Sequence, residues 1–515
     1  MPISSHFSWI DWFVVVLYLG LTTWIGHALK GKQSTIHDFF LAGRSLPWPA
    51  VCGSIIATEI SAITFIAVPG TVFAATGNFT YLQWAVGSII ARFIVGYYLV
   101  PIYYKKEVYS PYEFMSQRLE LSIKKITTIL FFLGAILGQS VRLLVTAIIL
   151  RTITGVDLHL CILIIGLFAV GWTLMGGMTT VIWTDVVQFG LFIFGGLLAL
   201  IWILATLEGG VSHLLSVGQE FGKLQILDLT TDPTVSFTLW VGLIAMPFQN
   251  LAAFGTDQLN TQRMFCCKNA KQARSAIIWS SCSQLITVLM LLVGLALFAY
   301  YQKHPLETNY QRLIKEDGND YIFPIWITTV LPVGLSGLVL AGAFAAAISS
   351  LDSILTALSQ STLSLMYGDN ATKKENSGLM LNRSRLCVII WGVALPLFAI
   401  LLNLIRGQID MLNLAFGMVT YTYGPLLAIL ILALLGKKIN LRALTFGIGL
   451  SISLTLYVRP DIYNIIAAIS PDQQEAFKPI MSYAWLYPLT TILTLLPPLL
   501  FSNILWIYYT KKLMK

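Results

Sequence analysis

Long apolar segments recur along the whole chain and leave little room for any architecture other than a membrane-embedded helix bundle. A helix needs about 20 residues to cross a hydrocarbon core of about 30 Å. Only 11% of the residues are charged, whereas a soluble domain carries about one quarter. We therefore predict an all-α polytopic membrane protein with about thirteen transmembrane helices. The expected spans are 8–28, 47–75, 79–104, 126–150, 158–177, 181–207, 235–262, 275–300, 323–366, 386–405, 410–436, 441–458 and 483–510.

Lysine and arginine gather in alternate loops between these spans. With the N-terminus outside, the inner loops hold the basic clusters at 105–125, 263–274 and 373–385 and a basic C-terminus, "TKKLMK". By the positive-inside rule we expect the N-terminus outside and the C-terminus in the cytoplasm. A plasma membrane, by default a bacterial inner membrane, is the expected location. This bias explains the net charge of +8, so we expect no nucleic-acid partner.

The sequence has no pattern typical of an enzyme or of an ATP-driven pump. Its six cysteines lack CxxC spacing, its six histidines do not cluster, and it contains no phosphate-binding loop or nucleophile elbow. The longest loops, 208–234, 300–322 and 459–482, are too short for an extramembrane domain. We therefore expect one transporter domain, residues 1–515, whose function lies between its helices.

Two apolar segments contain residues that interrupt a regular helix. Segment 47–75 includes "IATEISAITF" and ends in "VPG", and segment 235–262 includes "MPFQNLAAFGTDQ". Irregular backbone at membrane depth is tolerated only where it is buried in protein or lines a cavity. Each segment opens a block of five spans, 47–207 and 235–436, which is the spacing of an inverted five-plus-five repeat with broken first and sixth core helices. Residues 8–28 would form one peripheral helix, and 441–510 two more.

The segment "AGAFAAAISSLDSILTALSQS", residues 341–361, places its polar side chains on one helical face. At 100° per residue, Ser349, Asp352 and Ser353 share this face and the leucines occupy the other. Small and hydroxyl residues alone are common between membrane helices. A carboxylate at membrane depth costs ~2.5 kcal/mol or more and usually marks an ion or solute path.

Four other charged residues lie within spans, and each has more than one interpretation. Asp185 either caps the start of its helix or faces an ion path, and Arg92 either reaches the membrane surface or forms a structural ion pair. Glu59 and Arg142 either pair with each other or grip the charged ends of a solute. The aromatic residues Trp84 and Phe254 are core residues by default.

These motifs resemble the sodium:solute symporter family, which includes sodium-coupled sugar, proline and sialic acid carriers. The matching segments are "DFFLAGRSLPWPA", "GSIIATEISAITFIAVPG", "LMGGMTTVIWTDVVQ", "DQLNTQR" and "AGAFAAAISSLDSILTALS", in the family's order. The resemblance implies a fold of the leucine-transporter type and sodium as the coupling ion. It also implies secondary active import of a small polar solute by alternating access.

The resemblance assigns two ion sites to residues of this chain. A conserved sodium site would use backbone oxygens of Ala57, Ile60 and Ala346 with the hydroxyls of Ser349 and Ser350. A second site, for sodium or a proton, would use the set Asp185, Ser349, Asp352 and Ser353. Asp352 stands where the family has a hydroxyl residue, which leaves the number of ions per cycle open.

The same comparison assigns the solute site. Its predicted residues are Glu59, Ser61, Thr64, Gln83, Arg142, Gln249, Asn250 and Phe254. Glu59 with Arg142 suits an amino-acid-like solute or a small carboxylate. The alternatives are a sodium-coupled sugar or polyol carrier and a proton-coupled carrier of the same fold. The expected partners are this solute, sodium ions and the lipid bilayer, with the monomer as the functional unit.

Overall fold

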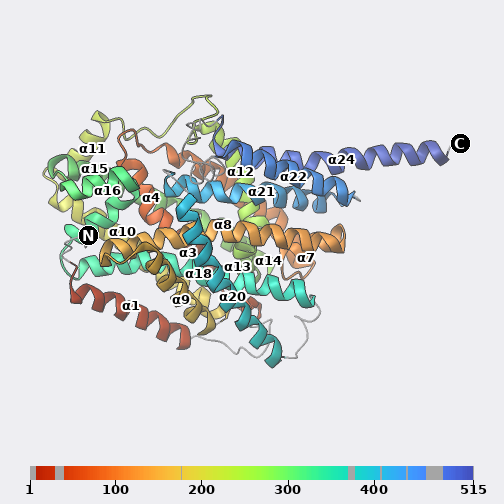
Figure 1. Cartoon of the computed structure of the whole chain (residues 1–515), viewed down its shortest axis with the longest axis horizontal. Coiled ribbons are helices and arrows are strands. Elements are labelled where there is room, and N and C mark those ends of the chain that lie inside the picture. The colour runs from red at the N-terminus through yellow and green to blue at the C-terminus, as the bar shows by residue number, and fades with distance from the viewer. Residues whose placement is uncertain are drawn as a thin grey trace.

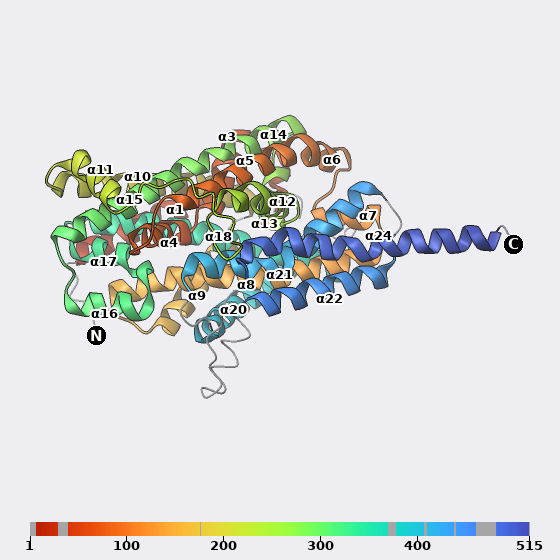
Figure 2. The ribbon, with the colours of Figure 1, turned by 90° about the horizontal axis from the view of Figure 1, so that it is seen from above.

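The computed structural model describes residues 7–28, 40–175, 177–368, 377–405, 409–436, 439–459 and 480–513. Within these ranges the chain forms an all-helical bundle whose long helices run side by side (Figure 1). Seen from above, α24 projects beyond the other helices (Figure 2). The longest helices are α1 (Trp9–Ala28), α8 (Leu121–Thr154), α9 (Leu158–Met175), α10 (Met178–Thr206), α15 (Ser283–Lys303), α18 (Leu335–Tyr367), α20 (Ser377–Ile405), α21 (Met411–Leu435), α22 (Leu441–Val458) and α24 (Leu486–Leu513).

Apolar helices of membrane-spanning length dominate the described residues. Ten are long and apolar enough to cross a membrane, or eleven when a bent pair counts as one span. Two shorter apolar helices, Leu158–Leu174 and Val241–Gly255, lie where two further spans are expected. The chain is therefore a polytopic helical membrane protein, as predicted, and thirteen spans remain a prediction.

The first expected interruption is a sharp break between α3 (Trp48–Glu59) and α4 (Ala62–Phe73). The two helices meet at 52°. Ile60 adopts an extended conformation that ends α3, and Ser61 caps α4 by accepting a hydrogen bond from the Ile63 backbone N–H at 3.3 Å. Serine is favoured at such caps because its hydroxyl satisfies an N–H that has no partner within the helix.

The second expected interruption separates α12 (Met246–Gly255) from α13 (Gln258–Phe265). Asp257 caps α13, and its Oδ1 accepts a hydrogen bond from the Leu259 N–H at 2.9 Å. The carboxylate also lies at the positive end of the helix dipole. Both predicted breaks are therefore present, each with a polar cap.

The expected single span 323–366 is wrong, because two helices occupy it. The short α17 (Ile322–Thr329) ends before Pro332, and α18 begins after Gly334, whose φ of 89° is a left-handed conformation. Proline lacks the N–H that a continuous helix needs, and only glycine adopts this φ without strain.

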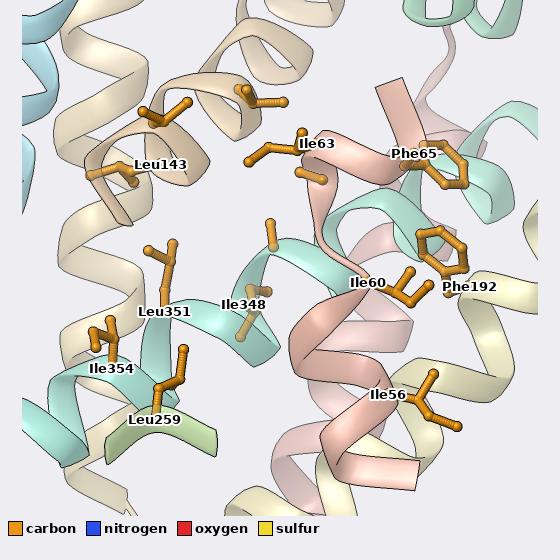
Figure 3. Close-up of a cluster of buried hydrophobic side chains, with 14 of the residues drawn as sticks. Ile56, Ile60, Ile63, Phe65, Leu143, Phe192, Leu259, Ile348, Leu351 and Ile354 are labelled. Carbon is orange, nitrogen blue, oxygen red and sulfur yellow. The ribbon is translucent and has the colours of Figure 1, made fainter. Parts of the chain in front are cut away.

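Apolar side chains join the broken helix to its neighbours. Figure 3 shows Ile60, at the end of α3, beside Phe65 of α4 and Phe192 of α10, with Ile348 and Leu351 of α18 across the break. These side chains belong to one continuous buried cluster that extends through most of the bundle. The break is thus held against the helix that carries the polar face.

Lys223, in the turn after α11 (Gly210–Glu220), anchors the far end of α4. Its side chain is fully buried, and its Nζ donates hydrogen bonds to the carbonyls of Val72 and Ala74 at 2.8 Å and of Gly77 at 3.1 Å. The ammonium also lies 3.9 Å from the centre of the Phe298 ring. A cation at a helix C-terminus interacts favourably with its dipole and unpaired carbonyls.

Replacing this lysine should destabilise the protein. We expect Lys223→Met to lower the midpoint of thermal unfolding by several degrees, since it removes about 2–4 kcal/mol of charge-assisted hydrogen bonding and cation–π interaction. Lys303→Met is the matched control, because Lys303 pairs with the exposed Glu208 at 3.0 Å and exposed pairs contribute little. Equal melting temperatures for the two variants in detergent would contradict this role.

Candidate functional site

A cavity opens between the broken helices and four of their neighbours. It encloses about 160 Å³ and is walled by α4, α8, α12, α15, α21 and α5 (Trp84–Ile94). Its size suits a small molecule. The polar or charged residues that line it are Thr58, Glu59, Ser61, Thr64, Ser88, Gln139, Arg142, Gln249, Asn250, Asn260, Ser283, Gln284 and Thr287.

Seven of the eight residues predicted for the solute site line this cavity, and Gln83 does not. The Gln83 side chain is buried and donates a hydrogen bond to the Phe237 carbonyl at 2.9 Å. Its Oε1 accepts a hydrogen bond from the Asp228 N–H at 3.2 Å. Gln83 therefore holds the loop that precedes η4 (Val241–Ala245) against the start of α5.

Glu59 forms an ion pair with Arg92. The alternative in which Glu59 pairs with Arg142 is therefore not found. The Arg92 side chain is fully buried, and one of its guanidinium nitrogens binds Glu59 Oε2. The guanidinium also stacks over Phe254, 4.5 Å from the ring centre. Phe254 thus lines the cavity and covers the ion pair.

Arg142 turns toward the break. Its NH1 donates a hydrogen bond to the Thr58 carbonyl at 3.0 Å. Asp257 is near enough to Arg142 for an electrostatic interaction. Its oxygens, however, accept hydrogen bonds from the Leu259 N–H and, at 2.8 Å, from the Tyr423 hydroxyl. No acidic side chain among the described residues lies within ion-pair distance of Arg142.

Two cavity residues that the sequence did not single out are Ser88 and Gln139. Both side chains are buried, and among the described residues Ser88 Oγ and Gln139 Oε1 have no hydrogen-bond partner. Gln139 lies one helical turn before Arg142 on α8. That spacing on an otherwise apolar helix is the signal that would have identified it.

Aromatic residues close one side of the cavity. Trp84 packs edge-on against Phe416 and Phe237, at centroid distances of 5.1 Å, and lies 5.4 Å from Tyr81. Its indole N–H donates a hydrogen bond to the Ser236 carbonyl at 3.0 Å. Trp84 and Phe254 are buried, as expected of core residues, and both also line the cavity, as predicted for Phe254.

The residues predicted for the conserved sodium site meet at the break. Among the described residues, no backbone N–H donates to the carbonyls of Ala57 and Ile60, which lie on either side of Glu59. On α18, Ser349 and Ser350 are fully buried, and Ser349 Oγ has no partner within the described part of the chain. Ala346 lies one turn earlier on the same helix. Carbonyl and hydroxyl oxygens are the ligands that a hard cation prefers.

A buried polar cluster lies beside this site and includes an arginine that the sequence placed in an inner loop. Arg263 of α13 is only 1% exposed and its NH2 lies 3.1 Å from Asp185 Oδ2. The guanidinium also donates to Ser353 Oγ, to Ser54 Oγ at 2.9 Å and to the Leu259 carbonyl at 2.6 Å. Asp185 lies within the body of α10, so it does not cap the start of that helix.

Asp352 belongs to the same cluster and is fully buried. Its Oδ1 lies 3.0 Å from the Ser353 hydroxyl. Asp352 Oδ2 and Asp185 Oδ1 have no hydrogen-bond partner within the described ranges. Two carboxylates therefore face one guanidinium, which leaves an excess of one negative charge when both acids are ionised.

The chain is similar to known sodium-coupled transporters. The model of the sodium:solute symporter family matches residues 39–448. The chain is 28% identical to the sodium/sialic acid symporter SiaT of Proteus mirabilis (strain HI4320), a match that covers 88% of this chain and 90% of the relative. It is 27% identical to the sodium/glucose cotransporter of Vibrio parahaemolyticus, covering 89% of this chain and 86% of the relative.

The fold also matches a solved structure. A sodium-coupled sialic acid symporter, described in a substrate-bound outward-open state with a novel sodium site, superposes with a TM-score of 0.81. The match covers 96% of this chain and 98% of that one at 25% identity.

The pairing of Glu59 with Arg92 predicts a characteristic pattern of stabilities. Glu59→Gln should lower the free energy of unfolding by about 3 kcal/mol, because it leaves the Arg92 charge buried without a counter-charge. The double variant Glu59→Gln, Arg92→Met should recover most of that loss. Additive losses in thermal unfolding of the single and double variants would contradict the pairing.

Proposed function

This chain belongs to the sodium:solute symporter family, and on that premise we propose that it imports a small hydroxylated carboxylate together with sodium. The chain is an integral membrane protein that couples sodium to the symport of a small solute, and it is not an enzyme. The carboxylate is our refinement of the broader prediction, which also admitted amino-acid-like solutes.

The observation that carries the proposal is the balance of charge around the cavity. Glu59 is neutralised by Arg92, which leaves Arg142 as the cationic group of the cavity wall that lacks a carboxylate within ion-pair distance among the described residues. Guanidinium binds carboxylate through paired, charge-assisted hydrogen bonds. An amino-acid-like solute would need an anionic partner for its ammonium group, and Glu59 is already paired.

The rest of the wall favours a solute rich in hydroxyl groups. Ser88 and Gln139 each bring a buried polar atom that no described residue binds, and Gln249, Asn250 and Gln284 add amides. A buried polar group without a hydrogen bond costs about 1–3 kcal/mol, so solute hydroxyls that bind these groups would stabilise the complex. Relatives described as sialic acid symporters and as a monocarboxylate transporter support an acidic solute. A neutral sugar is the alternative that the glucose cotransporter supports.

We place one sodium ion between the break and α18. Its ligands would be the carbonyls of Ala57, Ile60 and Ala346 and the hydroxyls of Ser349 and Ser350. Support for this set comes from the carbonyls of Ala57 and Ile60 and the Ser349 hydroxyl, which have no hydrogen-bond partner in the part of the chain that the structure describes.

We place a second cation, sodium in preference to a proton, at Asp185, Ser349, Asp352 and Ser353. The excess negative charge of two carboxylates over the Arg263 guanidinium supports it. A cation there would neutralise the cluster, whose ionised form is otherwise costly at membrane depth.

Sodium and solute would be coupled through the backbone of the break. Arg142 donates to the Thr58 carbonyl, and Thr58 directly follows the sodium ligand Ala57. A sodium ion that orders this backbone therefore also orders the guanidinium that receives the carboxylate. Coupling of this kind is reciprocal, so solute should raise sodium affinity by the same factor. A membrane potential would add ~2.3 kcal/mol per charge per 100 mV.

Our proposals for the oligomeric state, the orientation and the cellular location rest on the sequence. We propose a monomer with the N-terminus outside and the C-terminus in the cytoplasm, in a bacterial inner membrane. The alternating distribution of basic loops supports this orientation.

The solute class can be tested by thermal-shift screening of purified protein in sodium buffer against sugar acids, monocarboxylates, amino acids and neutral sugars. Sugar acids or other hydroxylated carboxylates should stabilise the wild type, and Arg142→Met should lose about 100-fold or more in affinity, since each tenfold corresponds to ~1.4 kcal/mol and a buried charge pair is lost. Stabilisation by neutral sugars that survives Arg142→Met would overturn the carboxylate proposal.

The sodium site makes a separate prediction for transport. In proteoliposomes, Ser349→Ala with Ser350→Ala should abolish sodium-driven uptake, because both hydroxyl ligands are lost. Ser336→Ala is the matched control, a buried serine on the same helix that bonds the Leu331 carbonyl at 3.1 Å. Full sodium dependence in the double variant would exclude these hydroxyls as ligands.

A further inference from the structure

The first helix has a buried polar stripe that the functions assigned so far do not use. Its buried residues recur at helical spacing and are Asp11, Val15, Tyr18, Thr22 and Gly26. The opposite face exposes Trp9, Phe13, Val16 and Trp24, as expected of a face toward lipid. α1 lies at the edge of the bundle (Figure 1), so its polar stripe faces inward.

The stripe fixes α1 to the two helices that carry the second cation cluster. At one end, Asp11 Oδ1 accepts hydrogen bonds from the N–H groups of Gly334 and Gly337, at 2.7 and 2.8 Å, where α18 begins. At the other end, the Gly26 carbonyl accepts a hydrogen bond from Thr180 Oγ1 of α10 at 3.1 Å. A Cβ at Gly337 would lie 2.5 Å from the Asp11 carbonyl oxygen, so the helices are in direct backbone contact.

Tyr18 lies between these two anchors and faces the cluster. Its side chain is 7% exposed, and its hydroxyl is close enough to the Gln188 amide and to the charges of Asp352 and Asp185 to interact with all three. Gln188 is 1% exposed and follows Asp185 by one turn on α10. Among the described residues, the Tyr18 hydroxyl and both polar atoms of the Gln188 amide lack hydrogen-bond partners.

Partnerless oxygens therefore converge here from three helices. Within the described part of the chain they are Asp185 Oδ1, Gln188 Oε1, Ser349 Oγ, Asp352 Oδ2 and the Tyr18 hydroxyl. Leaving so many buried polar atoms without partners would cost about 1–3 kcal/mol each, so they indicate a ligand. Oxygen atoms with an excess negative charge suit a hard monovalent cation.

We propose that Gln188 is a ligand of the second cation and that Tyr18 of α1 positions it. With the cation bound, Gln188 Nε2 would donate to the nearby Tyr18 hydroxyl oxygen, and this bond would turn Gln188 Oε1 toward Asp185 and Asp352. Tyr18 thus acts through Gln188, as groups outside a metal's ligand shell commonly orient its ligands. This inference rests on the proposed second cation at Asp185 and Asp352.

The test is a sodium titration of the purified chain in lipid nanodiscs, with potassium replacing sodium at constant ionic strength, read by sodium-22 binding. Gln188→Leu and Tyr18→Phe should each raise the sodium concentration for half-saturation by about tenfold and make the titration less steep, because loss of a ligand or of its orienting partner typically costs 10–100-fold. Thr23→Val is the matched control on the same helix, since the Thr23 hydroxyl donates to the Leu19 carbonyl of its own helix at 2.5 Å.

A second pair of variants separates ligand chemistry from packing. Gln188→Glu should keep or tighten sodium binding, because a carboxylate is a stronger ligand than an amide and needs no particular rotation. In the Tyr18→Phe background, Gln188→Glu should restore the wild-type affinity. If both residues served packing alone, a buried glutamate would weaken binding and would rescue nothing, and the proposal would be overturned.

The outcomes distinguish this inference from the function on which it rests. A wild type without sodium binding would overturn both. Wild-type binding that Ser350→Ala weakens, but that Gln188→Leu and Tyr18→Phe leave unchanged, would overturn only the roles of Gln188 and Tyr18. Melting curves in potassium buffer identify any variant that fails to fold, and the Gln188→Glu rescue then decides the question within folded protein.

Discussion

Everything about the candidate sites depends on one constraint, that backbone carbonyls at membrane depth need a partner. The break at Ile60 and Ser61 releases carbonyls from the helical pattern. Arg142 donates to the Thr58 carbonyl, and the carbonyls of Ala57 and Ile60, which no backbone N–H of the described residues binds, are the proposed ion ligands. A continuous helix would satisfy all of these groups internally and could bind neither ion nor solute through them. The 52° bend therefore frees the carbonyls on which the proposed sites depend.

Charge is balanced separately in two regions that lie against this break. In the first, the ion pair of Glu59 with Arg92 has no net charge, so the charge of the cavity wall there is the positive charge of Arg142. In the second, Arg263 neutralises one of the two carboxylates, Asp185 and Asp352. When both acids are ionised, one negative charge remains for a cation to neutralise. The proposed sites thus have opposite charge, an anionic solute in the cavity and a cation in the cluster, although both lie against the same break.

The sequence predicted the elements better than it predicted their partners. Hydropathy located most spans to within a few residues, and the polar face of α18 followed from helical spacing alone, because both depend on short-range periodicity. The division of 323–366 was missed because its length and hydropathy suggest one span, although Pro332 and Gly334 mark the break. Arg263 was assigned to an inner loop because its neighbours are polar, whereas the fold buries it in the cluster. Long-range packing decides that Glu59 forms its ion pair with Arg92 and not with Arg142, and that Gln83 anchors a loop. One sequence does not contain this information.

The helix α13 has only eight residues, yet it belongs to both regions. Asp257, at its N-terminus, is hydrogen-bonded to Tyr423 of α21 on the wall of the cavity. Arg263, on its second turn, holds Asp185 and Ser353. The backbone rises about 9 Å along the helix axis from Asp257 to Arg263 at 1.5 Å per residue, so a displacement of α21 that pulled on Asp257 would also shift Arg263. This two-turn helix thus links the wall of the proposed solute cavity to the proposed ion cluster.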